Sequence, residues 1–184
     1  MMAAWELRRL YPNPDRVLPT RLGNVLRAAE DRAGDKYGLD AVLVWPRLFP
    51  LLAEGLASAL DDARNQLDMA ARFAVTFLLA VVAALILLAA HGWWVTVAAG
   101  AGFLAWLSYR AAVNAAIAYG ELMETAFDLH RFDLLKALHV PLPPDHKHEL
   151  ETNARVTEFL RRDFPVELEY DHGAALPNET DDES

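Results

Sequence analysis

Residues 73–109 read FAVTFLLAVVAALILLAAHGWWVTVAAGAGFLAWLSY, and His91 is the only residue in this stretch that can carry a charge. The sequence His-Gly-Trp-Trp divides the stretch into two apolar halves. At about 1.5 Å of rise per helical residue, each half approaches the roughly 30 Å of a hydrocarbon core, with the second half on the short side. We therefore expect two transmembrane helices, over residues 73–90 and 94–110, joined by a tight turn.

The flanks of this stretch distinguish a membrane hairpin from a buried hairpin in a soluble domain. Apolar residues cover every face of the first half, whereas a soluble helix usually keeps a polar face. Aromatic and basic side chains stand where a membrane interface would lie. We expect these interface anchors to be Arg72, Trp93, Trp94, Trp106, Tyr109 and Arg110.

The charges outside the stretch predict the orientation and exclude one class of partner. There are ten Lys and Arg before Phe73, seven after Tyr109 and none in the turn, which predicts that both termini are cytoplasmic. The net charge of −9 lies entirely in the C-terminal arm, and an acidic arm argues against binding nucleic acid. Cysteine is absent, so disulfides, thiolate metal sites and thiol catalysis are excluded.

Four regions are expected along the 184 residues. Residues 1–45 form a cytoplasmic N-terminal arm, and residues 46–140 form a long helical hairpin that includes both spans. Residues 141–170 form a cytoplasmic helix and a possible strand, and residues 171–184 form an acidic, disordered tail. The expected fold class is an all-α membrane protein: a transmembrane helical hairpin with long cytoplasmic helical extensions, to which a minor two-strand cytoplasmic element could be added.

The arms contain recognisable element signals. Residues 21–33 predict an amphipathic helix with Thr20 as its N-cap and Gly34 at its end, which packs on the long helices or lies on an anionic leaflet. Pro46 suits the first turn of the helix that leads into the membrane. Ala41–Trp45 and Val166–Tyr170 have strand-like composition and could pair. Residues 145–163 predict a helix capped by Asp145.

Two groups of residues are candidates for assembly or conduction. The second span is rich in small residues, and Ala98 with Gly102 forms a small-xxx-small pair, which suits packing on the first span or self-association equally well. The predicted helix-packing or oligomer surface is Ala98, Gly102, Ala105 and Asn114. Glu121, Glu124 and Asp128 share a helical face below the membrane and could line a cytoplasmic mouth, or could be solvated and ion-paired.

No catalytic, cofactor or metal site is predicted. His146 and His148 are two residues apart, a spacing that points them to different faces of a helix, so a solvated polar stretch explains them better than a metal site. The spans contain no Asp, Glu, Lys or Arg, which argues against an ion-coupled carrier.

Residues 18–52 (LPTRLGNVLRAAEDRAGDKYGLDAVLVWPRLFPLL), the apolar hairpin and the sequence AFDLHRFDLLKALHVPLP resemble uncharacterised two-span membrane proteins of the bacterial inner membrane. The resemblance implies that location and brings no activity or cofactor with it. We expect a non-enzymatic membrane subunit or anchor whose partners are the bilayer, its own copies or another protein. The alternative is a homo-oligomeric ion channel or membrane-disrupting pore.

Overall fold

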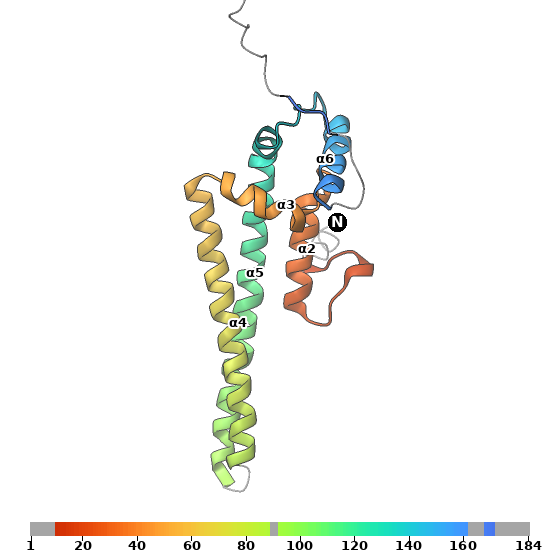
Figure 1. The fold of residues 1–184 in the computed structure, drawn as a ribbon. Coiled ribbons are helices and arrows are strands. Elements are labelled where there is room, and N and C mark those ends of the chain that lie inside the picture. Colours follow the sequence, from red (N-terminus) through yellow and green to blue (C-terminus); the bar gives the residue numbers. More distant parts are fainter. Residues whose placement is uncertain (1–9, 89–91, 162–167, 172–184) are drawn as a thin grey trace, which may run out of the picture.

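A long antiparallel helical hairpin dominates the chain (Figure 1). The computed structural model describes residues 10–88, 92–161 and 168–171, and within these residues the fold is all-α. Helix α4 (Glu54–Leu88) and helix α5 (Val95–Ala137) have 35 and 43 residues. They are therefore about 52 and 64 Å long. Next to the turn, the 3-10 helix η3 (Gly92–Trp94) begins at a glycine with φ +59°.

Three shorter helices lie beside one end of this hairpin, mainly on the side of α5, and leave the other end bare (Figure 1). These are α2 (Arg21–Asp35), α3 (Ala41–Leu48) and α6 (His146–Arg161), which together we call the head. Short 3-10 turns, η1 (Pro14–Arg16) and η2 (Phe49–Leu51), precede α2 and follow α3. We call residues 54–72 and 110–137 the proximal half of the hairpin, and the described residues between 73 and 109 the distal half.

The helix predicted over residues 21–33 is present and extends to Asp35. Its Thr20 cap is confirmed, because the Gly23 backbone N–H donates to Thr20 Oγ1 at 3.1 Å. The helix packs along α5, as one of the two predicted placements requires. A side chain at Gly34 would collide with the Leu39 carbonyl oxygen, 2.2 Å from an ideal Cβ, so glycine permits the tight return of the chain.

The strand predicted at Ala41–Trp45 is wrong, since these residues begin α3. The Asp40 carboxylate accepts hydrogen bonds from the Val42 and Leu43 backbone N–H groups and caps the helix. Ala41, Val44 and Leu48 are buried at helical spacing. Local β propensity was therefore overridden by the cap and by packing on the head.

The start predicted for the first long helix is also wrong. Pro46 lies inside α3, and the chain then turns through η2 before α4 begins at Glu54. The second proline, Pro50, belongs to η2 and supports this break. Leu48, Leu52 and Leu60 are nevertheless buried in one cluster, although Leu48 lies in α3, Leu52 in the segment between η2 and α4, and Leu60 in α4.

The core lies between the head and the proximal half. Its largest cluster joins Phe127 on α5 to Leu48 of α3 and Leu60 of α4, and Trp45 stacks on Phe127 with ring centroids 6.2 Å apart. A second cluster joins Val25 of α2 to Leu67 and Ala112 nearer the distal half. The head and the proximal half of the hairpin therefore share one packed core.

Several predictions fall wholly or partly outside the described residues. These are the beginning of the N-terminal arm, the end of the first span with His91, and the acidic tail. The predicted helix over residues 145–163 is α6 as far as Arg161, and Asp145 caps it through the His148 backbone N–H at 2.9 Å. Residues 168–170 of the second predicted strand are not in a strand, and residues 166–167 lie outside the description.

Candidate membrane-binding surface

The distal half presents large apolar side chains on both of its helices with nothing packed over them. Ile86 is 76% exposed and Leu79 is 64% exposed. The exposed large apolar residues of this half are Phe73, Val75, Leu78, Leu79, Val82, Leu85, Ile86, Leu87, Trp93, Trp94, Val95, Val97, Phe103, Leu104, Trp106 and Leu107. Soluble monomers rarely expose a contiguous apolar surface of this extent.

Helix α4 is the one helix among the described residues that is long and apolar enough to cross a membrane by itself. No residue of its most apolar 18-residue window is buried, which separates it from the core helix of a soluble protein. Helix α5 does not pass the same test. Its apolar run ends at Arg110, and its glycine, serine and tryptophan residues lower its hydropathy.

Aromatic side chains mark both ends of the distal half, where the sequence placed its interface anchors. At the turn, Trp93 and Trp94 stack with ring centroids 4.7 Å apart. At the other end, the Arg110 guanidinium lies 5.1 Å from the ring centroid of Trp106. About 22 Å of helix separates Trp94 from Tyr109. We call the part of the hairpin between these two aromatic ends the apolar band, and it is thinner than an average hydrocarbon core.

The small residues of α5 meet α4 of the same chain. Ala98 is buried, and a side chain on Gly102 would meet Val81 Cγ2 at 3.8 Å. Ala105 is half-buried, whereas Asn114 is exposed. The structure thus brings Ala98 and Gly102 into the intramolecular contact. Their use between copies of the chain stays a prediction.

Two of the three predicted mouth carboxylates hold the head on the hairpin. Arg32 of α2 donates to Glu124 of α5 at 2.5 Å. Asp128 accepts from Lys36 Nζ at 2.5 Å and from the Tyr37 hydroxyl at 2.9 Å. Burial alone would lower the pKa of Lys36, but the hydrogen bond and the negative charge of Asp128 raise it above its ordinary value. Glu121 is exposed on the same helix.

Helix α6 is held by a buried acid that the sequence did not reveal. Glu149 is 4% exposed and accepts from Arg131 Nε at 2.6 Å. The Arg131 guanidinium also lies 4.3 Å from the ring centroid of Tyr37. His146 Nδ1 lies 3.3 Å from the other carboxylate oxygen of Glu149, so this histidine serves the same network.

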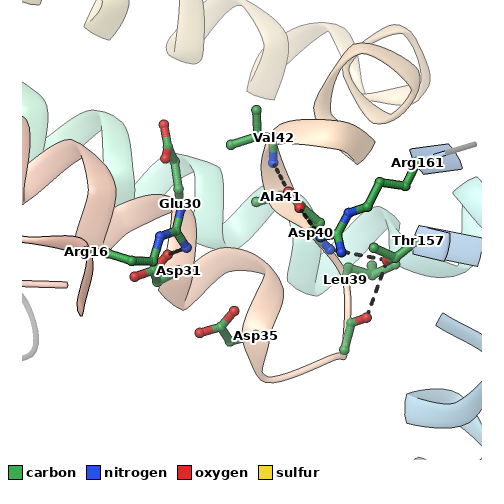
Figure 2. A pocket seen from close by; sticks show the side chains of 11 residues that line it. Arg16, Glu30, Asp31, Asp35, Leu39, Asp40, Ala41, Val42, Thr157 and Arg161 are labelled. Carbon is green, nitrogen blue, oxygen red and sulfur yellow. Dashed lines mark hydrogen bonds and ion pairs between the residues drawn. The ribbon is translucent and has the colours of Figure 1, made fainter. Parts of the chain in front are cut away.

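An acidic hollow of about 360 Å³ lies on the head between α2, α3 and α6 (Figure 2). Asp31 pairs with Arg16, and Arg161 donates to Asp40 Oδ2 at 2.9 Å. Burial is the main cause that raises the pKa values of Glu30 and Asp35. Among the described residues, no group of three or more His, Cys, Asp or Glu side chains is arranged to hold a metal ion.

Comparison with known proteins gave no match to a family model, to a curated protein or to a solved structure.

Proposed function

We propose that this chain is a non-enzymatic membrane anchor whose distal half crosses the bilayer as a helical hairpin. One observation carries the proposal: large apolar side chains are exposed around both helices of the distal half, while the proximal half packs one face on the head and carries charged side chains on its exposed faces. A bilayer core covers such a surface without leaving backbone groups unpaired, because the hydrogen bonds of both helices are internal.

The geometry of the hairpin supports a second span in α5, although the length and composition of α5 alone do not. Helix α5 runs antiparallel to α4 along its length, so a bilayer around the distal half of α4 also surrounds residues 95–109. Both open ends of the hairpin then lie on the same side. We place that side, with the head and both termini, in the cytoplasm of a bacterial inner membrane, because the turn carries no Lys or Arg.

The head is the part that we propose to bind a partner protein or another copy of the chain. Its position beside the bilayer fixes its orientation and raises its effective concentration at the membrane. Small residues on α5 would assist self-association only where they remain open, and Ala98 is already buried within the chain.

The alternative function, a homo-oligomeric pore, has less support. A single hairpin cannot enclose a channel, and the charges of Glu124 and Asp128 are compensated by Arg32 and Lys36. A count of copies per particle in nanodiscs separates the two functions. Rings of about five or more copies would favour a pore, whereas monomers or dimers would favour the anchor.

The crossing itself is tested by single-cysteine labelling, which the cysteine-free chain allows without a background. Ser58→Cys lies on the exposed proximal half and Trp93→Cys lies at the turn. A membrane-impermeant maleimide applied to intact cells should label Trp93→Cys and spare Ser58→Cys, and inverted vesicles should give the opposite result. Thr76→Cys, in the apolar band, should be spared from both sides. Labelling of Ser58→Cys and Trp93→Cys from the same side would contradict the proposal.

A further inference from the structure

Three arginines lie where the head meets the apolar band. Arg72 immediately precedes the distal half on α4, Arg110 immediately follows it on α5, and Arg21 is the first residue of α2. The Leu22 backbone N–H donates to the Tyr109 hydroxyl at 3.2 Å, which fixes the first turn of α2 at the level of Tyr109. Leu22, Ala71 and Tyr109 belong to the same packed cluster. The neighbours of all three arginines therefore meet at one level of the hairpin.

These arginines differ from most of the other arginines in the head and its surroundings, which have carboxylate partners. Arg16, Arg32 and Arg131 pair with Asp31, Glu124 and Glu149. Arg21, Arg72 and Arg110 are exposed, and none of them pairs with a carboxylate in the part of the chain that the structure describes. The nearest acid along α4 is Asp68, one helical turn above Arg72, and no ion pair joins the two.

The surface beside Arg72 suits an amphipathic ligand. Arg72 lines one hollow with Asn65, Asp68, Met69 and Phe73, where polar and apolar side chains are mixed. It also lines a second, almost wholly apolar hollow with Ala71, Val75 and Thr76. A guanidinium at the border of an apolar hollow is placed to bind the phosphate of a lipid whose acyl chain follows that hollow. Guanidinium groups bind phosphate oxygens through paired hydrogen bonds and are less strongly hydrated than ammonium groups.

We infer that Arg21, Arg72 and Arg110 form a cationic collar that binds the phosphate groups of anionic phospholipids in the leaflet next to the head. The inference rests on the proposed membrane crossing, since the collar meets headgroups only if the distal half lies in the bilayer. It extends that proposal, because it names the lipid class that the anchor prefers. A surface charge near an anionic leaflet gains up to roughly fivefold in affinity per basic residue.

Spin-labelled lipids test this preference directly in bilayers of phosphatidylcholine. The full chain is reconstituted with traces of spin-labelled phosphatidylglycerol or phosphatidylcholine, and the motionally restricted fraction is compared. The wild type should prefer phosphatidylglycerol several-fold, and high salt should weaken that preference. The triple variant Arg21→Gln, Arg72→Gln, Arg110→Gln should bind the two lipids nearly equally.

A matched triple variant controls for net charge. Arg47, Arg64 and Arg155 are exposed arginines without a carboxylate partner among the described residues, and none of them adjoins the apolar band. Their replacement by glutamine should leave the preference unchanged. Equal loss in both triple variants, or no preference in the wild type, would overturn the collar. Displacement by soluble glycerol phosphate would also overturn the assignment to lipid. A complete absence of restricted lipid would instead overturn the membrane crossing itself, so the two failures are distinguishable.

Discussion

The two halves of the hairpin share the same pair of helices and differ in what surrounds them. In the proximal half, apolar side chains are buried at helical spacing, as Leu60, Ala63 and Leu67 are on α4, and charged side chains occupy the other faces. In the distal half, apolar side chains occupy all faces and almost none is buried. The difference indicates two solvents along one helix pair: water and the head at one end, and lipid at the other.

A charge in the distal half should have the largest effect. Leu79 is 64% exposed, so Leu79→Arg removes little packing within the chain. In a bilayer the same change costs about 2.5–3.5 kcal/mol at the centre of a span. We expect the fraction of protein that resists alkaline extraction from membranes to fall steeply.

The matched control for this change is Gln66→Arg, an exposed position of the proximal half on the same helix. This variant should remain in the membrane fraction. If both variants were extracted alike, the two halves would not differ in their surroundings.

The second-largest effect is expected from alanine substitutions at two glycines of α5, Gly120 in the proximal half and Gly100 in the distal half. An ideal Cβ on Gly120 would lie 2.6 Å from Ala29 Cβ of α2, whereas nothing lies within 4 Å of one on Gly100. Gly120→Ala should therefore loosen α2 from α5, with an overpacking cost of about 1–3 kcal/mol. Hydrogen–deuterium exchange of the α2 amides should accelerate.

Gly100→Ala is the control, and it should leave exchange in α2 unchanged. It should even favour the helix slightly, because alanine is a better helix former than glycine by about 1 kcal/mol. Equal exchange in the two variants would mean that α2 does not pack closely on α5 near Gly120.

The distal half could be predicted from sequence and the head only in part. Apolar residues on every face, with Trp93 and Tyr109 at the ends, predict a helical pair without any knowledge of tertiary contacts. The all-α class, the Thr20 cap and the Asp145 cap are also local, and each is confirmed. Local signals sufficed because these features depend on residues adjacent in the chain.

The head was harder because its decisive contacts join residues far apart in sequence. Arg32 meets Glu124 across 92 positions, and Asn153 donates to the Tyr37 carbonyl across 116. The strand-like composition of Ala41–Trp45 misled the prediction, because the Asp40 cap and the burial of Val44 favour a helix. The sequence did contain a signal for this helix. Asp40 directly precedes the apolar residues 41–45, and an aspartate in that position is typical of a helix N-cap.

The length of the apolar band leads to a smaller expected effect. With about 22 Å of α5 between Trp94 and Tyr109, the hairpin should be most stable in bilayers of short-chain lipids, at a gain of a fraction of a kcal/mol per Å of mismatch removed. Thermal unfolding in nanodiscs of increasing acyl-chain length measures this. Arg110→Leu lengthens the apolar run and should move the optimum to thicker bilayers, whereas Arg155→Leu on α6 should not. An optimum independent of chain length would contradict the placement of the band.

The smallest expected effect concerns the pH dependence of the head, far from the bilayer. Burial, reinforced by Asp31 and opposed by Arg16, raises the pKa of Asp35. A carboxyl whose folded pKa lies above its unfolded value contributes stability that is complete below the unfolded pKa, near 3.8, and is lost as the pH rises through the folded pKa. Asp35→Asn should therefore raise the unfolding temperature of the head at neutral pH and change it little near pH 4.

Asp62→Asn, on an exposed face of the proximal half, is the control for this pH dependence. It removes the same charge outside the acidic hollow, so its effect should be nearly the same at both pH values. A pH-independent effect of Asp35→Asn, equal to that of Asp62→Asn, would mean that Asp35 is as well solvated as a residue on the open face of α4. The acidic hollow would then be an ordinary part of the wet surface, and the contrast between the halves would rest on the apolar band alone.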